Sequence, residues 1–177
     1  MQQNMVVTER ECKARGVPNG DLQLIPKGEF LNITQDLGGN YTVTLRGNML
    51  RIDGTDADAI GRKPQKLDFP ILEDGLIHEE HVLQALATIY DPEIPIDLLS
   101  LGLIYKVFAN QDTKTVHIDM TLTAPACGMG PVLVGDVEYR VSMVPNVKKV
   151  AVELIFEPPW SREMMSEEAQ LEAGIFF

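Results

Sequence analysis

The residue best placed to do chemistry is Cys127, which stands in a loop of small residues just before a predicted helix. The loop runs from Thr123 to Pro131, and Gly128 follows the cysteine directly. Unpaired backbone N–H groups and the positive end of a helix dipole lower the pKa of a thiol at such a place, and the thiolate is the form that binds metal or attacks. The sequence therefore indicates Cys127 as a candidate metal or cofactor ligand, with Thr123 and Gly128 as other functional candidates. The alternative is a buried, inert cysteine, which is common for this residue type.

A second candidate segment is acidic and begins at Asp91. Three carboxylates, those of Asp91, Glu93 and Asp97, fall within seven residues, and two prolines stiffen the chain between them. Carboxylates are hard oxygen donors, so a rigid acidic loop can orient a metal ion or a partner's cation. The competing interpretation is a solvated turn in which Asp91 caps the chain locally.

Cysteine usage limits the metal chemistry that the chain can support. The 177 residues include only two cysteines, Cys12 and Cys127. This count excludes a disulfide scaffold and a closed four-cysteine zinc or iron–sulfur site, so any metal role must be shared or transient. Cys12 falls in a polar stretch from Thr8 to Arg15 that we expect to be helical, with three basic side chains around it. These cations favour a thiolate, whereas an incidental cysteine near a loose terminus fits the pattern at least as well.

Two further patterns resemble metal sites without completing them. His78 and His81 are three residues apart but have no third ligand in phase nearby, so a solvated first helical turn is the favoured interpretation. Asp53, Asp56 and Asp58 resemble the start of a calcium loop, but a lysine–proline pair stands near the position where the closing glutamate is expected. A solvated loop is predicted here.

The charge and hydropathy of the chain exclude two classes of partner. The net charge is −11, and residues 71–177 carry the whole imbalance. Such a surface repels phosphates, so we expect no binding to nucleic acid. No apolar run approaches the ~20 residues that a membrane helix requires, and the first residues lack the features of a signal peptide. A cytoplasmic protein with no membrane contact is therefore expected.

The change in charge also predicts two modules, residues 1–72 and 73–177, joined near the proline-containing stretch 62–70. The first module contains short runs of alternating apolar and polar residues separated by turn signals, which predicts a small sheet of hairpins. These runs are residues 22–25, 30–33, 41–45 and 49–52.

The second module reads as an open α-β-β-α-β layer followed by a C-terminal helix. A helix is predicted from Ile77 to Tyr90, and a second from Pro131 to Val144 with an apolar stripe. Strands are predicted over residues 102–110, 114–123 and 147–156, and a tail helix after Ser166. Gly135 inside the second helix indicates a close approach of that helix to the sheet. Trp160, in the proline-rich corner before the tail, is expected to be a core lid or a partner anchor, with the lid favoured.

The second module resembles the small α+β domain shared by the PaaD protein and by iron–sulfur maturation factors of bacteria and of the eukaryotic cytosol. The resemblance rests on residues 91–94, 101–104 and 120–123 together with Ala126 and Cys127. The N-terminal stretches 33–39 and 56–61, with 158–160 and 165–169 in the tail, look like the SufT branch of these proteins. The resemblance then covers nearly the whole chain.

This resemblance implies an accessory, non-catalytic role in the maturation of iron–sulfur proteins. It implies that Cys127 is the functional cysteine, and that Asp91 and Glu93 form the family's acidic signature. The cargo is then a transient iron–sulfur cluster or iron, which thiolates from two chains of a homodimer could hold between them. The expected partners are the iron–sulfur assembly machinery and client apoproteins.

Two other functions stay open at the level of the sequence. A thiol enzyme with Cys127 as nucleophile needs a base nearby, but His117 lies six residues before Thr123, about 20 Å along an extended strand. A metal-free adaptor would instead use the acidic face of the second module to dock a basic partner.

Overall fold

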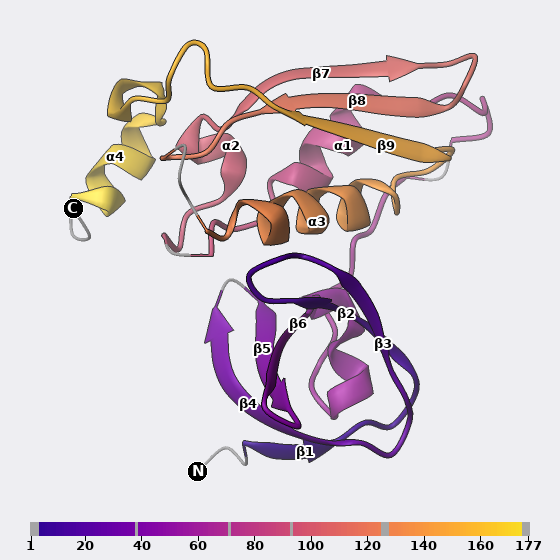
Figure 1. The fold of residues 1–177 in the computed structure, drawn as a ribbon. Helices are drawn as coiled ribbons and strands as arrows, with labels where there is room; N and C mark the ends of the chain where they lie inside the picture. The colour runs from indigo at the N-terminus through magenta and orange to yellow at the C-terminus, as the bar shows by residue number, and fades with distance from the viewer. Residues whose placement is uncertain (1–3, 38, 71, 93, 125–127, 175–177) are drawn as a thin grey trace.

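The computed structural model describes residues 4–37, 39–70, 72–92, 94–124 and 128–174, which form a mixed α+β fold with two open sheets (Figure 1). The predicted fold class is confirmed. Within this described part of the chain, no helix is long and apolar enough to cross a membrane. In the sequence, all strands of the first sheet precede residue 72, and all strands of the second sheet follow residue 73. The division of the chain into two modules at this point stays a prediction.

The first sheet, called the N-terminal sheet below, has six strands in the order β1-β4-β5-β6-β2-β3, and all neighbours are antiparallel. The strands are β1 (Met5–Val7), β2 (Cys12–Gly16), β3 (Leu22–Ile25), β4 (Phe30–Leu37), β5 (Asn40–Leu45) and β6 (Asn48–Ile52). The sheet curves around the short 3-10 helix η1 (Gly54–Ile60) and buries an aliphatic core against it (Figure 1). All four predicted runs of this module form strands.

The stretch around Cys12 is strand β2, so the predicted helix is wrong. Cys12 and Ala14 point into the core of the N-terminal sheet, while Lys13 and Arg15 point to the opposite face. Both cations lie beside a helix of the second module, a contact that the local sequence pattern does not reveal.

Cys12 is also not a thiolate. Its side chain is 1% exposed, and burial, followed by the charge of Asp56, raises the pKa of the thiol to about 11. Arg10 acts in the opposite direction, but its guanidinium is bound to the carboxylates of Asp56 and Asp58 at 2.9 and 2.8 Å. Desolvation therefore outweighs the cations that suggested a reactive thiol.

The acidic stretch that resembled a calcium loop is ordered by hydrogen bonds and is not a solvated loop. Asp53 is buried and caps the start of η1, where its carboxylate accepts a hydrogen bond from the backbone N–H of Thr55 at 2.9 Å. Asp56 and Asp58 receive the guanidinium of Arg10. The three carboxylates thus hold protein groups of the chain itself.

The second sheet has three strands in the order β7-β8-β9, which are β7 (Ile104–Asn110), β8 (Thr115–Met120) and β9 (Lys149–Leu154). β7 and β8 are antiparallel, whereas β8 and β9 are parallel, so the chain must cross over between them. The crossover contains α3 (Gly130–Val141), and α3 lies with α1 (Glu79–Leu86) on one face of the sheet (Figure 1). A short helix, α2 (Leu98–Leu101), precedes β7, and η2 (Arg162–Met164) and α4 (Glu167–Ala173) follow β9.

The first predicted helix of this module is shorter than its apolar pattern suggested. α1 ends at Leu86, and Ile89 and Tyr90 lie in the turn that follows. Leu83, which was placed on the buried face, is 41% exposed, whereas His81 is only 7% exposed and is not part of a solvated turn. His81 packs against the ring of Phe69, a residue of the connecting segment that the helical pattern could not anticipate.

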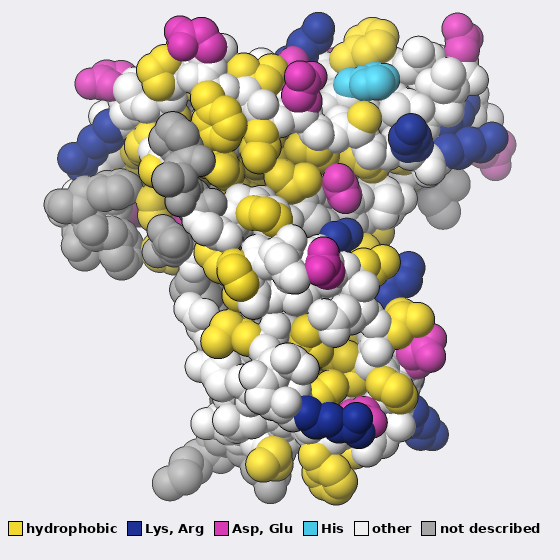
Figure 2. All heavy atoms as spheres, viewed as in Figure 1, with side chains coloured by type: hydrophobic (Ala, Val, Ile, Leu, Met, Phe, Trp, Pro, Cys, Tyr) yellow, Lys and Arg dark blue, Asp and Glu magenta, His cyan; other side chains and the backbone are white. Residues whose placement is uncertain are grey.

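α3 forms where a helix was predicted, although it ends at Val141 and not at Val144, and it faces two layers. Its predicted stripe of Leu133, Val137, Val141 and Val144 is buried in the core of the second sheet. A Cβ atom on Gly135 would lie 2.4 Å from Cδ of Arg15, so the close approach is to the N-terminal sheet and not to the three-stranded sheet as expected. α3 is therefore sandwiched between the two sheets (Figure 1), and the two parts of the molecule are in direct contact (Figure 2).

A buried polar network joins the outer face of α3 to the N-terminal sheet. Arg140 is fully buried, and its guanidinium donates to Asp53 Oδ2 at 3.0 Å, Asn40 Oδ1 at 2.7 Å and the Thr88 carbonyl at 2.8 Å. One turn earlier, Asp136 accepts from Arg51 at 3.2 Å and from Asn40 at 3.3 Å. Because these side chains are buried, removal of one leaves an uncompensated polar group.

We expect Arg140→Ala to lower the free energy of unfolding by about 3 kcal/mol or more, because it leaves the Asp53 carboxylate buried without its main cation. Arg46→Ala is the matched control, since Arg46 pairs with Glu29 but its side chain is 76% exposed. Urea unfolding followed by circular dichroism measures both changes. Equal losses of stability in the two variants would contradict a dominant role for the buried network.

A second expectation concerns Cys12. At pH 8 iodoacetamide should leave Cys12 unmodified in the folded protein, because a thiol with a pKa of about 11 is ionised in about one molecule in a thousand. The same residue should react fully once the chain is unfolded in guanidinium chloride. Peptide mapping by mass spectrometry measures the modification, and rapid labelling of folded Cys12 is the result that the structure rules out.

Candidate functional site

The candidate thiol segment connects the middle strand of the second sheet to α3. Cys127 itself lies outside the described residues, but β8 ends at Met120 and α3 begins at Gly130, so residues 121–129 form the connection. Ala124 and Gly128 are exposed, and Thr123 is half-buried. A Cβ atom on Gly128 would meet nothing within 4 Å. The residues next to the undescribed part of the segment, Ala124 and Gly128, are thus open to solvent, whereas Thr121 and Leu122 are buried.

The start of α3 has the local structure that the sequence predicted. Pro131 occupies the first turn, and the residue at the helix cap, Met129, makes no side-chain hydrogen bond to the free N–H groups. Gly130 is buried, and a Cβ atom there would lie 2.9 Å from Cδ1 of Leu122, so the first residue of α3 packs closely on the side chain of Leu122, two residues after the end of β8. The positive end of the helix dipole is therefore directed toward the thiol segment without a side-chain cap.

Asp91 is buried and shapes the acidic segment. Its carboxylate accepts a hydrogen bond from the N–H of Ile94 at 3.0 Å, and its own N–H donates to the carbonyl of Ile96 at 3.1 Å. The carboxylate of Asp97 caps α2 by accepting from the N–H of Ser100 at 3.1 Å. Local capping by Asp91 is thus observed, but the turn is not solvated at that residue. Glu93 lies outside the described residues.

Both candidate segments lie at the same end of the second sheet. The acidic segment continues through α2 into β7, whose first residue, Ile104, is opposite Met120, the last residue of β8. Beyond the ladder, the N–H of Thr121 donates to the carbonyl of Leu103 at 2.8 Å. The fold therefore brings the chain that follows Asp91 and the chain that leads to Cys127 side by side.

The histidines are not arranged as a metal site. His78 Nε2 lies 2.8 Å from Asp74 Oδ2, and the rings of His78 and His81 are 5.2 Å apart. Across the described residues, no three His, Cys, Asp or Glu side chains gather closely enough to hold a metal ion. His117 is exposed beside the ring of Phe108, on the face of the sheet opposite the core that packs against α3.

Trp160 belongs to the core. Its ring packs against the second sheet's core, and its indole N–H donates to the carbonyl of Leu101 at 2.7 Å. The tail helix also forms as predicted, with the Ser166 hydroxyl accepting from the N–H of Ala169 at its start. The favoured interpretation of Trp160 as a lid agrees with this geometry.

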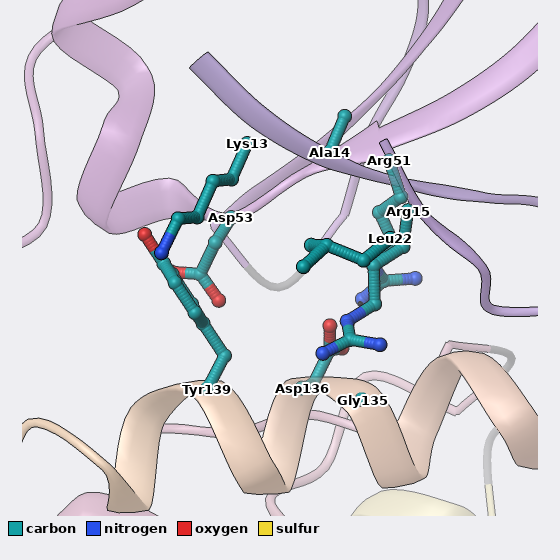
Figure 3. Close-up of a pocket in the computed structure, with 9 residues that line it drawn as sticks. All are labelled: Lys13, Ala14, Arg15, Leu22, Arg51, Asp53, Gly135, Asp136 and Tyr139. Atoms are coloured by element: carbon teal, nitrogen blue, oxygen red, sulfur yellow. Dashed lines mark ion pairs between the residues drawn. The ribbon is translucent and has the colours of Figure 1, made fainter. Parts of the chain in front are cut away.

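The interpretation of the sequence did not identify the residues that bind the face of α3 directed toward the N-terminal sheet. In Figure 3, Arg15 and Arg51 of the N-terminal sheet extend toward Asp136 of α3, while Lys13 and Asp53 lie beside Tyr139. Burial raises the pKa of Asp136 to about 6, against the opposing effect of Arg51. One signal in the sequence could have indicated this contact. Gly135 and Asp136 are followed one turn later by Arg140, on a helix face that would otherwise be expected to meet solvent.

Known proteins resemble the second module closely. A family model described as "Iron-sulfur cluster assembly protein" matches residues 79–154. The chain is 48% identical over 96 residues to an Fe-S protein maturation auxiliary factor of Porphyromonas gingivalis. This match covers 54% of this chain and 90% of the relative. It is 38% identical to the auxiliary factor YitW of Bacillus subtilis, and the match covers 59% of this chain and 99% of YitW. It is 37% identical to the auxiliary factor SufT of Staphylococcus aureus, and that match covers 49% of this chain and 98% of SufT.

Solved structures agree with these sequence matches. A domain of unknown function, DUF59, from Bacillus anthracis matches with a TM-score of 0.52 at 37% identity, covering 55% of this chain and 92% of that one. A conserved hypothetical protein from Thermotoga maritima matches with a TM-score of 0.52 at 36% identity, and the match covers 57% of this chain and 98% of that one. These matches cover about half of this chain, so the resemblance stated for its N-terminal part stays a prediction. The chain belongs to the iron–sulfur cluster assembly protein family, as the motifs around Asp91 and Cys127 indicated.

Proposed function

We propose that this protein is an accessory factor in the maturation of iron–sulfur proteins, a carrier or adaptor that passes iron or a cluster to client apoproteins through Cys127. One observation carries the proposal: the chain is 37–48% identical to three maturation auxiliary factors over 90–99% of their own lengths. A further relative, from Deinococcus radiodurans, is named an iron–sulfur cluster carrier protein and is 38% identical over 72 residues.

The chemistry of the two thiols supports a transient rather than a permanent hold on the cargo. Cys12 is buried and un-ionised, so each chain offers Cys127 as its one candidate soft ligand among two cysteines. An iron–sulfur cluster needs more thiolates than one, so two chains, or this chain and a client, must share it. A cluster held by few ligands is readily handed on.

The acidic segment has a supporting role in this proposal. Asp91 is buried and its carboxylate accepts a hydrogen bond from the N–H of Ile94, so we propose that it shapes the acidic segment and does not itself bind cargo. Glu93, Thr123 and Gly128 are proposed to complete the site with Cys127. We also propose that the protein acts in the cytoplasm with the iron–sulfur assembly machinery, without catalysing a reaction itself.

A thiol enzyme is less well supported than a carrier. His117, the base that the sequence left open, projects from the face of the second sheet that does not pack on α3, whereas α3 starts directly after the thiol segment. A general base must lie within hydrogen-bond reach of the nucleophile or one water away from it. The family relatives are named auxiliary factors, which agrees with a non-enzymatic role.

Anaerobic reconstitution with iron and sulfide tests the proposal. The wild-type protein should develop the visible absorption of an iron–sulfur cluster, and Cys127→Ser should lose it, because serine is a poor ligand for soft iron–sulfur sites. Cys12→Ser is the matched control and should keep the band, since its thiol is buried and protonated.

Client activity provides the second half of this test. In cells grown under iron limitation, Cys127→Ala should lower the activity of iron–sulfur enzymes while the protein still folds. A cluster band absent from the wild type, together with client activity unchanged by Cys127→Ala, would favour the metal-free adaptor and reject the carrier.

A further inference from the structure

A small pocket, called the cationic pocket below, lies between the N-terminal sheet and the outer face of α3 (Figure 3). Strands β2 and β6 contribute three cations to its wall, which are Lys13, Arg15 and Arg51, and α3 contributes Asp136. The free volume is about 20 Å³, little more than the ~10–15 Å³ that a cavity needs to hold one water molecule. Such a space admits the charged end of a side chain, but not a whole cofactor.

The positive charge in the cationic pocket is only partly compensated. Arg15 and Arg51 are directly opposite each other on β2 and β6, so their side chains share one face of the sheet, where like charges repel. Asp136 lies 3.2 Å from Arg51, whereas the second lining carboxylate, that of Asp53, is bound to Arg140 from outside the pocket. The three lining cations therefore have one carboxylate of the pocket available to them.

Two of these cations carry a donor group for which the described residues supply no acceptor. The side chain of Arg51 is 8% exposed, and its Nε–H has no hydrogen-bond partner in the described part of the chain. Lys13 is exposed, and its ammonium group has no partner among the described residues either. Arg15 differs, because it donates to the carbonyl of Gly20 and lies 3.9 Å from Glu138. A buried donor without an acceptor is costly, so an acceptor from outside the chain is favourable at Arg51.

Exposed leucines flank the mouth of the cationic pocket. Leu22 and Leu24 of β3 are 56% and 59% exposed, and they lie opposite Arg15 and Lys13 in the β2–β3 ladder, on the same face of the sheet as the cations. Leu22 lines the cationic pocket, and Leu24 lines a neighbouring hollow that shares Lys13 and Tyr139 with it. Apolar side chains beside an incompletely compensated charge are typical of a surface that binds another protein.

We propose that the cationic pocket is a docking site for an acidic segment of a partner protein, in which a carboxylate side chain binds Arg51 and Lys13 while neighbouring apolar side chains pack on Leu22 and Leu24. Charge complementarity selects this occupant, because a carboxylate supplies the missing acceptor and the missing negative charge together. The first module is also the part of the chain that can attract such a segment, since residues 71–177 carry the whole negative net charge.

Nuclear magnetic resonance on the 15N-labelled intact protein tests this docking site. The probe is a capped tripeptide of leucine, glutamate and leucine, and the control probe has glutamine in place of glutamate. The glutamate peptide should cause saturable shifts of the Arg51 Nε–H signal and of the backbone amide signals of Leu22 and Leu24. The glutamine peptide should bind about fivefold more weakly or worse, because hydrogen bonds to a charged acceptor are stronger than those to a neutral one.

A pair of variants connects the binding to the cationic pocket. Lys13→Gln removes an exposed charge and leaves the buried network untouched, so the protein should fold normally and bind the glutamate peptide about threefold more weakly. Lys27→Gln is the matched control, since Lys27 is an exposed lysine in the turn between β3 and β4, and it should leave the affinity unchanged.

The alternative occupants give different results in the same experiment. The proposal fails if the glutamate peptide causes no saturable shift or binds no better than the glutamine peptide, because the pocket then holds water only. Acetate that binds as tightly as the glutamate peptide would indicate an adventitious anion only, without a contribution from the leucines. Shifts of the same signals that grow with protein concentration in the absence of peptide would assign this face to a second copy of the chain and overturn the proposal.

Discussion

The buried guanidinium of Arg140 is the interaction on which the arrangement of this protein depends. It reaches from α3 to Asp53, which caps η1, and to Asn40, which in turn accepts a hydrogen bond from the N–H of Gly54 at 2.8 Å. Removing a charged group from water is costly, and this arginine is compensated only when both sheets are in place. The hydrogen bonds of Arg140 can therefore all form only when the two sheets have this orientation relative to each other.

This constraint explains why α3 is the central element of the fold. Its inner stripe fills the core of the second sheet, and its outer face completes the polar network of the N-terminal sheet. The same helix is also the crossover that parallel pairing of β8 and β9 requires. The thiol segment joins this helix at its start, so the part of the chain proposed to contact cargo is attached to an element anchored on both of its faces.

The sequence predicted the elements whose pattern is local. Val116, Ile118 and Met120 alternate strictly and form the buried side of β8, and the apolar stripe of α3 was identified correctly. The errors occurred where a distant residue decides the outcome. Asp53 was expected in solvent because its partner, Arg140, lies 87 positions further along the chain. Cys12 was expected in a helix because the stretch from Thr8 to Arg15 is polar, although two of its cations, Lys13 and Arg15, lie beside α3. Of the candidate site, the sequence placed Thr123 and Gly128 correctly in the connection before α3, whereas Cys127 and Glu93 lie outside the described residues and their roles stay predictions. The close contact of Gly20 with the carbonyl of Pro131 could not be predicted from the sequence, because it depends on how the N-terminal sheet and α3 meet.

The glycine at position 135 stands on a helix face that does not meet water. On a helix face that meets water, glycine lowers the stability of the helix relative to alanine, and an aspartate and an arginine that follow it are solvated and not buried. Here the three residues make room for, and then bind, a neighbouring sheet. In this chain, their joint presence marks the helix face that lies against a second layer of the fold and not against water.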